Sequence, residues 1–486
     1  MAGLRLAAVA FHLCLLLSPS SSLRWLHDAA ESNGGSRTAY HFQPAKNWQN
    51  DPNGPMYHDG VYHLFYQYNP HGASWGNGNL SWGHSVSVDL VNWTALDPDS
   101  PLDANGCWSG SATILSDGNP VMLYTGIDAA GNQHDNFRDP STAWLGPDGL
   151  WRVAVSAKFN TGAGSALIYR SKDFRRWERN AVPLYESRAT GMVECPDLFP
   201  VAEPGAENGL DYLPSNGAAR HVLKLSVVAT LQDYYMVGRY DDTTDTFVLA
   251  VGADNDSRTW RRVQVLLRRA QEPACALGLG QRWPIEEIET LRKMRFGLPG
   301  AEVNSGGMNE IIGMAGSQAD VEVVFEIPAL EGAENLEPNG LLDPQKLCGE
   351  KGASVSGGVG PFGLVVLAAG SARSGWVFKH DGKYKVLMCT DLTRSTTRAD
   401  VYKPSYGGFV DMDIEETKSI SLRTLIDHSV VESFGGWGRT CITARVYPEH
   451  TEMSNNHLYM FNNGTDAVKV SKLEAWELAT ATVNDG

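Results

Sequence analysis

Strand-length apolar runs separated by turn residues are the feature that most constrains the fold. From Tyr40 to about Trp260, runs such as 120–126 and 150–155 alternate with Gly, Pro, Asn and Asp. Few of these runs keep the 3.6-residue period of a helix, whereas short runs bounded by turn residues are typical of strands. The segment 146–149, Gly-Pro-Asp-Gly, predicts a hairpin. This half of the chain is therefore predicted to be all-β.

A repeated pattern indicates how these strands are grouped. Ser-Val-Asp-Leu-Val-Asn-Trp at 87–93 resembles Ser-Lys-Asp-Phe-Arg-Arg-Trp at 171–177, and a fainter copy ends at Trp260. Repeated sheet units with a recurring Asp and Trp favour the blades of a β-propeller. The alternative is a set of chance matches in a chain with 14 tryptophans.

The pattern changes after residue 262. Residues 263–282 show neither strand alternation nor an amphipathic face, and 285–293 fits a short connecting helix. From about residue 300 strand patterns return, for example at 321–327 and 419–426, which favours a β-sandwich. The predicted organisation is a propeller over 37–282, a linker over 283–299 and a sandwich over 300–486.

The N-terminus predicts export. Residues 1–22 combine a basic Arg5, an apolar run from Leu6 to Leu17 and a small-residue exit, as a secretory signal peptide does. The run is too short for a membrane span, and no later apolar stretch is long enough. The net charge of −16 disfavours nucleic acid as a partner. Four N-glycosylation sequons agree with secretion, at Asn79, Asn92, Asn255 and Asn463.

Asp51 lies in Trp-Gln-Asn-Asp-Pro-Asn-Gly at 48–54, where Pro52 and Gly54 predict a turn. An alternating run over 61–68 follows, so Asp51 is expected at the entrance to a sheet. The alternative is an Asx-turn in which the carboxylate bonds only its own backbone.

Two further acids have unusual neighbours. Asp139 lies between Arg138, which would favour its ionised form, and Pro140, which restrains the turn. Glu194 follows Met192 and Val193, and burial among apolar neighbours would raise its pKa, as a general acid requires. A pair of carboxyls in opposite protonation states is the usual equipment for glycoside hydrolysis.

Nearby polar and aromatic residues fit a sugar substrate. Amides and hydroxyls would bond sugar hydroxyls, and indole rings would stack on sugar faces. The candidates are Asn50, Gln67, Ser109, Trp48, Trp75, Trp82 and Trp108. The alternative is that the acids form surface ion pairs and the tryptophans fill core.

The chain resembles the plant acid invertases and fructan exohydrolases of glycoside hydrolase family 32. Five ordered motifs carry the resemblance, at 48–54, 65–70, 107–111, 137–140 and 194–197, and two more lie at 431–435 and 444–448. Pro196 after Cys195 matches the cell-wall type.

The resemblance implies a five-bladed β-propeller followed by a β-sandwich. It also implies a retaining β-fructofuranosidase in which Asp51 is the nucleophile, Glu194 the acid/base and Asp139 the residue that holds the ring hydroxyls. Trp48, Asn50, Gln67, Trp75, Trp108, Ser109 and Arg138 would line the fructose site. Sucrose or fructans are the implied substrates, without a metal or organic cofactor.

Further features are implied by the same resemblance. They are a Cys348–Cys389 disulfide, location in the apoplast or cell wall, and a proteinaceous invertase inhibitor as a partner.

The chain also departs from the family. Relatives carry several dozen more residues near 131–136 and a longer stretch in place of 263–282, so propeller strands are expected to be missing. The usual Trp before the acid/base is Val193, which would remove an aromatic wall from the site. An Asp and a Lys usual in sucrose-hydrolysing relatives are replaced by Val228 and Leu231, which favours fructans. A second hypothesis is a catalytically impaired sugar-binding or regulatory homologue.

Overall fold

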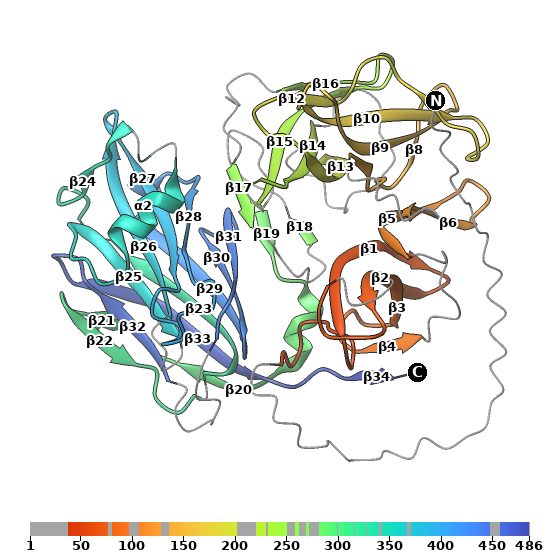
Figure 1. The fold of residues 1–486 in the computed structure, drawn as a ribbon. Helices are drawn as coiled ribbons and strands as arrows, with labels where there is room; N and C mark the ends of the chain where they lie inside the picture. The colour runs from red at the N-terminus through yellow and green to blue at the C-terminus, as the bar shows by residue number, and fades with distance from the viewer. Residues whose placement is uncertain are drawn as a thin grey trace, which may run out of the picture.

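The computed structural model describes residues 37–75, 80–96, 106–127, 136–201, 220–229, 232–249, 258–261, 269–271, 281–298, 300–314, 316–327, 329–338, 340, 343–366, 371–447 and 457–485. The predicted signal peptide and the sequons at Asn79 and Asn255 lie outside these residues. Two bodies of strands lie side by side, a set of small sheets and a two-layered sandwich (Figure 1). Among the described residues, no helix is long and apolar enough to cross a membrane.

The first body contains five sheets, named here blades I to V in chain order. Blade I holds β1 (Trp48–His58), β2 (Val61–Asn69), β3 (Ser81–Ser87), β4 (Trp93–Leu96) and the C-terminal β34 (Val483–Asp485). Blade II holds β5 (Cys107–Ile114) and β6 (Pro120–Gly126). Blade III holds β7 (Phe137–Arg138), β8 (Trp144–Leu145), β9 (Trp151–Lys158), β10 (Gly164–Ser171), β11 (Glu178–Arg179) and β12 (Tyr185–Ser187). Blade IV holds β13 (Val193–Val201), β14 (Arg220–Val227), β15 (Gln232–Asp241), β16 (Thr246–Leu249) and β17 (Arg258–Arg261), and blade V holds β18 (Arg269–Gln271) and β19 (Gln281–Trp283).

Blades II and V have two strands each within the part of the chain that the structure describes, whereas the other blades have five or six. The two short blades adjoin the two places where the sequence lacks residues of its relatives. The all-β propeller is confirmed, whereas the expectation of missing strands stays a prediction, because residues 97–105, 128–135, 262–268 and 272–280 lie outside the described residues.

The repeated Ser-x-Asp motif forms the same turn in two blades. In blade I, Asp89 Oδ1 accepts hydrogen bonds from the backbone N–H groups of Val91 and Asn92. In blade III, Asp173 Oδ1 accepts from Arg175 and Arg176 in the same way. The repeat is therefore structural, because each aspartate satisfies backbone donors after a strand.

The second body is a sandwich of two sheets. The propeller-facing sheet holds β20 (Arg292–Gly297), β21 (Ala301–Val303), β23 (Gln318–Glu326), β29 (Ser419–Asp427), β30 (Val430–Gly435), β31 (Thr440–Arg445) and β33 (Val468–Leu478). The outer sheet holds β22 (Gly307–Glu310), β24 (Glu334–Asn335), β25 (Val359–Val366), β26 (Ser371–His380), β27 (Lys383–Asp391), β28 (Ser405–Val410) and β32 (Leu458–Asn462). Short helices are η1 (Glu286–Leu291), α2 (Pro344–Lys351) and α3 (Ile414–Thr417).

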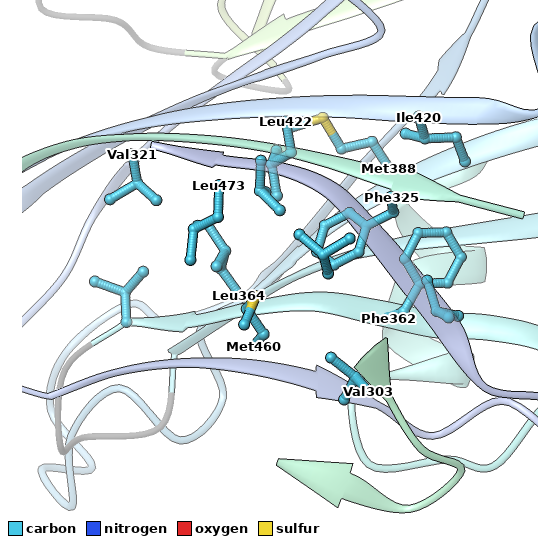
Figure 2. Packing of buried hydrophobic residues seen from close by; sticks show 14 of the residues in the cluster. Val303, Val321, Phe325, Phe362, Leu364, Met388, Ile420, Leu422, Met460 and Leu473 are labelled. Carbon is cyan, nitrogen blue, oxygen red and sulfur yellow. The ribbon is translucent and has the colours of Figure 1, made fainter. Parts of the chain in front are cut away.

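Alternate residues of the two sheets form the sandwich core. Val321 and Leu473 from the propeller-facing sheet approach Leu364 and Met460 from the outer sheet (Figure 2). This alternation is the reason for the period-two pattern in the sequence. A Cys348–Cys389 disulfide ties α2 to β27, as the family resemblance implied.

Strand pairing differs from the predicted boundaries at two places. The linker was expected to continue to residue 299, but β20 pairs with β33 in the sandwich. The sandwich was expected to keep the C-terminus, but β34 pairs in parallel with β4 of blade I. The sandwich therefore begins earlier than expected, and the C-terminal strand belongs to a propeller sheet rather than to the sandwich.

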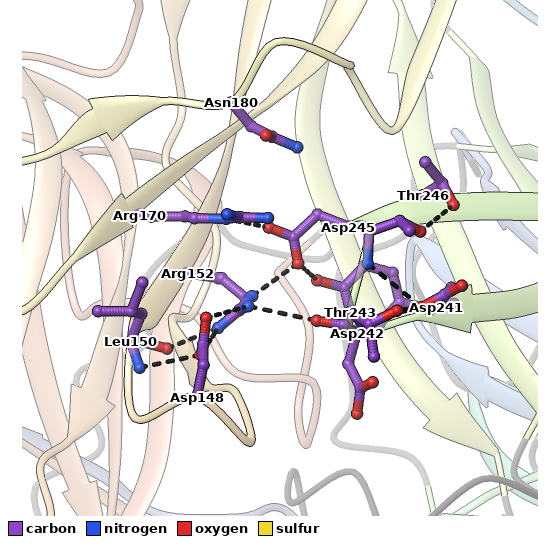
Figure 3. Close-up of polar contacts among 12 residues, drawn as sticks. Asp148, Leu150, Arg152, Arg170, Asn180, Asp241, Asp242, Thr243, Asp245 and Thr246 are labelled. Atoms are coloured by element: carbon purple, nitrogen blue, oxygen red, sulfur yellow. Dashed lines mark hydrogen bonds and ion pairs between the residues drawn. The ribbon is translucent and has the colours of Figure 1, made fainter.

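A buried ionic cluster joins blades III and IV (Figure 3). Asp245 is fully buried and accepts hydrogen bonds from Arg152 Nε at 2.6 Å and Tyr240 Oη at 2.5 Å, and it also pairs with Arg170. Arg152 is itself buried and makes a second pair with Asp148. Each charge has a partner, so the desolvation cost of the cluster is offset only while the cluster is complete.

We predict that Asp245→Asn lowers the free energy of unfolding by about 3–5 kcal/mol, because it removes the buried carboxylate that pairs with the buried Arg152 and with Arg170. Asp400→Asn is the control, since Asp400 pairs with Arg398 on the surface. Urea unfolding should show a large loss for the first variant and no measurable loss for the second. Equal losses would contradict the role given to the cluster.

The N-terminal segment is bound to the sandwich through Asp427. Its carboxylate accepts hydrogen bonds from the backbone N–H groups of Tyr40 at 2.9 Å and His41 at 2.7 Å, and from His41 Nδ1 at 2.8 Å. His41 Nε2 lies 3.5 Å from Glu432 Oε2. Burial lowers the pKa of His41, but the hydrogen bonds and charges of Asp427 and Glu432 outweigh it and raise the pKa from 6.5 to about 9.

We predict that this contact stabilises the protein in a pH-dependent way. The folded pKa of His41 is above the unfolded value, so the stabilisation is complete below pH 6.5 and is lost as pH rises through about 9. The loss should amount to about 3 kcal/mol. Urea unfolding between pH 6 and 9.5 should show it in the parent and in His58→Gln, a control at a partly exposed histidine, and not in His41→Gln. A parallel decline in His41→Gln would refute the assignment.

Candidate active site

Four of the predicted site residues lie on the end strands of four sheets. Asp51 is on β1, Ser109 on β5, Arg138 on β7 and Glu194 on β13, and each of these strands ends the hydrogen-bonded order of its blade. Asp139 directly follows β7. In Figure 1, β1, β5 and β13 lie on the sides of their blades that face one another. The propeller therefore brings together residues that lie far apart in the sequence.

Asp51 lies at an irregularity in the β1–β2 register, between Asn50 and Pro52. Such a bulge turns one side chain away from the regular alternation. Ser109 Oγ donates to Asp51 Oδ2 at 2.6 Å, and Asn50 Nδ2 donates to Asp51 Oδ1 at 2.9 Å. Gln67 Nε2 donates to Ser109 Oγ at 2.9 Å, which leaves the serine proton for Asp51. Asp51 is therefore held by side chains from three strands rather than by an Asx-turn alone.

Asp139 is buried and has a φ of 60°, which is rare for a residue other than glycine. Its Oδ2 accepts a hydrogen bond from the Cys195 N–H at 3.2 Å and lies 3.5 Å from Arg138 Nε. Burial raises the pKa of Asp139 to about 7, against the lowering effect of Arg138. Arg138 favours the ionised form, as expected from the sequence, but desolvation has the larger effect on the pKa of Asp139.

Glu194 contacts the same arginine. Arg138 Nη2 donates to Glu194 Oε1 at 2.9 Å, and the glutamate side chain is 38% exposed. The burial expected for Glu194 therefore falls on Asp139 instead. Val193 is fully buried in the core between blades III and IV, so a larger residue there would not form a wall beside Glu194. Alternation along β13 sends the two side chains to opposite faces.

The aromatic candidates separate into three groups. The Trp108 ring lies beneath the Arg138 guanidinium, 5.8 Å from ring centroid to Cζ, and Trp48 is half-buried at the start of β1. Trp82 is core, packed against Phe65 and Tyr124. Trp75 is 56% exposed, so it stays a predicted ligand contact without support from its burial.

Two contributions to the site were not expected from the sequence, although Cys195 lies within the motif at 194–197. They are the backbone N–H of Cys195 and the hydroxyl of Thr125, which accepts from the Asp139 N–H at 2.8 Å. The spacing between Thr125 and Asp139 carries no known pattern, and only the fold brings them together. No three His, Cys, Asp or Glu side chains gather as metal ligands within the described ranges.

The side-chain amides of the two described sequon asparagines form hydrogen bonds within the protein. Asn92 Nδ2 donates to Asp89 and its Oδ1 accepts from the Thr482 N–H, while Asn463 Nδ2 donates to the Ala353 carbonyl. Glycosylation at these positions stays a prediction.

We predict that Asp139 costs the protein stability at high pH. Its folded pKa of about 7 is above the unfolded 3.8, so the cost is absent below about pH 4 and complete above about pH 7. Asp139→Asn should raise the free energy of unfolding at pH 8 by up to about 4 kcal/mol and leave it unchanged at pH 4. Urea unfolding at both pH values checks this, with Asp59→Asn as an exposed control. A gain of equal size at both pH values would contradict the assignment.

Comparison with known proteins assigns the family. The chain matches the glycosyl hydrolases family 32 N-terminal domain over residues 41–136 and 129–263, in two pieces that meet at the short blade II, and the family 32 C-terminal domain over 287–477. It is 58% identical to beta-fructofuranosidase, insoluble isoenzyme 7, of Oryza sativa subsp. japonica over 572 residues, covering 99% of this chain and 96% of the relative. That alignment is longer than the 486-residue chain, so the relative carries segments that this chain lacks.

Two fructan-degrading enzymes are similar as well. The chain is 58% identical to the fructan 6-exohydrolase of Triticum aestivum, covering 99% of both chains. It superposes on the crystal structure of fructan 1-exohydrolase IIa from Cichorium intybus with a TM-score of 0.85 and 39% identity, covering 93% of this chain and 99% of that one. These matches span both bodies of the structure, and the chain therefore belongs to glycosyl hydrolase family 32 and is a glycoside hydrolase.

Proposed function

We propose that the protein is a retaining β-fructofuranosidase of cell-wall type that releases terminal, non-reducing β-D-fructofuranosyl residues from sucrose or fructans. The observation that carries the proposal is the set of hydrogen bonds linking the three acids. Ser109 reaches Asp51, the Cys195 N–H reaches Asp139, and Arg138 reaches Glu194. Three carboxyls from three blades thus share one polar neighbourhood, and a retaining glycosidase uses two such carboxyls, one as nucleophile and one as acid/base.

Asp51 is the proposed nucleophile. The donors Ser109 and Asn50 occupy both carboxylate oxygens and orient them before the sugar arrives. Attack of a carboxylate oxygen on the anomeric carbon breaks the bond to the leaving oxygen and forms a fructosyl ester. Orientation by two donors supports this role because a preorganised nucleophile avoids the entropy of alignment in the transition state.

Glu194 is the proposed acid/base. Its partial exposure leaves a path for the leaving group and for the incoming water. It would protonate the leaving oxygen in the first step and take a proton from water in the second. Arg138, which contacts both Glu194 and Asp139, would hold the two side chains at a fixed separation.

Asp139 is the proposed sugar-holding residue. With a pKa of about 7, it carries a proton in acidic solution and can both donate to and accept from sugar hydroxyls. Its burial strengthens such hydrogen bonds, because the local dielectric constant is low.

The short blades are compatible with an active enzyme, which we favour over a catalytically impaired homologue. The strands missing from blade II would extend it beyond β6, on the side away from β5. Asp51, Ser109, Arg138 and Glu194 all lie on end strands that are present. Loss of outer strands therefore leaves the residues of the proposed mechanism in contact.

The substrate preference is proposed to favour fructans. Val228, after β14, stands where sucrose-hydrolysing relatives carry an acid, and Leu231 lies outside the described residues. The similar relatives include a beta-fructofuranosidase and a fructan 6-exohydrolase at equal identity, so they support the broader activity without choosing the substrate. We further propose secretion to the cell wall, and a proteinaceous invertase inhibitor as a candidate partner.

Fructose release from sucrose, inulin and levan tests the proposal. The parent should release fructose, faster from at least one polymer than from sucrose. Asp51→Asn should lower kcat by at least about 10³-fold, as loss of a covalent nucleophile does in other hydrolases. Asp59→Asn, at an exposed turn aspartate, should leave kcat unchanged.

Methanol as acceptor tests retention, with methyl β-fructofuranoside as the expected product. A folded parent that releases no fructose would refute the enzyme, and faster sucrose cleavage than cleavage of both polymers would refute the fructan preference.

A further inference from the structure

Thr125, near the end of β6, connects two site residues that do not touch each other directly. Its Oγ1 donates to the Ser109 carbonyl at 3.1 Å and accepts from the Asp139 N–H at 2.8 Å. The side chain is buried, at 8% exposure. A hydroxyl has one proton to donate and lone pairs to accept, so both bonds form with the correct polarity at the same time.

The bond to Asp139 acts on a strained residue. Asp139 has a positive φ, which is rare for a residue other than glycine, and it precedes Pro140, which restricts its backbone further. A buried N–H without a partner is costly, and strained conformations persist only where surrounding groups hold them. The Thr125 hydroxyl is the acceptor for this N–H.

The bond to Ser109 lies within a second irregularity. The β5–β6 register is regular from Gly110 to Ile114 but shifts between Cys107 and Gly110, the stretch that holds Ser109. The ladder therefore does not fix the Ser109 backbone there, and the Thr125 side chain supplies a hydrogen bond to its carbonyl. The side chain of the same serine donates to Asp51.

We propose that Thr125 is a positioning residue that sets the separation of Asp51 and Asp139 by holding Ser109 on one side and the Asp139 backbone on the other. The proposal rests on the proposed function and deepens it. It also gives a physical reason why blade II needs both of its described strands, β5 and β6. β5 carries Ser109 and β6 carries Thr125, so two strands are the smallest remnant of this blade that keeps both links.

Three variants test the proposal. Thr125→Val keeps the branched shape and removes the hydroxyl, whereas Thr125→Ser restores it. The matched control is Thr113→Val on β5, because the buried Thr113 Oγ1 also accepts a backbone N–H, that of Ala143 at 2.9 Å, away from the acids.

We predict that Thr125→Val lowers kcat/KM for fructose release by about 10- to 100-fold, the size of effect expected from a small misplacement of reacting groups. Thr125→Ser should recover activity to within about threefold of the parent, because it restores the hydroxyl. Thr113→Val should lose thermal stability to a similar extent as Thr125→Val but keep the parent kcat/KM.

A second readout does not depend on activity. The Asp139 carboxyl can be titrated in the ligand-free protein by infrared difference spectroscopy against Asp139→Asn. The hydrogen bond from the Cys195 N–H lowers the pKa of Asp139. Loosening the Asp139 backbone should weaken this bond. The Asp139 titration should therefore move to higher pH in Thr125→Val alone. The alkaline limb of the kcat/KM profile should move in the same direction, because the protonated form of Asp139 is the one proposed to hold the sugar.

The outcomes separate the two proposals. If Thr125→Val matches Thr113→Val in both kcat/KM and the Asp139 titration, Thr125 has no positioning role. If the parent releases no fructose but the titration still moves only in Thr125→Val, the proposed function fails and the positioning role stands.

Discussion

The burial of the Asp139 carboxyl is the constraint on which the site depends. Removing a carboxylate from water is unfavourable, and the one nearby guanidinium does not compensate for it, as the pKa of about 7 indicates. Two hydrogen bonds hold the residue in place. The Cys195 N–H donates to the Asp139 side chain, and the Asp139 N–H donates to the Thr125 hydroxyl. A positive φ at Asp139 and at Cys195 accompanies these bonds. Burial of Asp139 thus lowers the stability of the protein at the place where the proposed chemistry needs a fixed, desolvated acid.

In the propeller, the site is formed by the end strands of the blades. Site residues come from β1, β5, β7 and β13. Blade II contributes Ser109 to Asp51 of blade I, and blade III contributes Arg138 to Glu194 of blade IV. Outer strands contribute support rather than chemistry, which explains how two blades of two described strands are compatible with a complete set of acids. The buried Asp245 cluster provides a separate connection between blades III and IV, outside the site.

The two bodies are joined through both ends of the described chain. The N-terminal segment bonds to Asp427 of the sandwich, and the Ala481 N–H bonds to the Ala39 carbonyl. A small apolar cluster lies at this junction and contains Tyr40, Val91, Ile288, Leu478 and Ala481. Blade I, which carries Asp51, is therefore braced by β34, a strand that follows the sandwich in sequence.

The sequence by itself determined the strand-rich fold, the repeated aspartate turns and the choice of candidate acids, because these depend on local period, turn chemistry and ordered motifs. It did not determine which acid is buried. Arg138 and Val193 are local neighbours, but desolvation of Asp139 and exposure of Glu194 follow from strands remote in the chain. The same holds for the core position of Trp82 and for the link made by Thr125. Burial, register and long-range hydrogen bonds arise only when the sheets assemble, so the tertiary structure alone decided them.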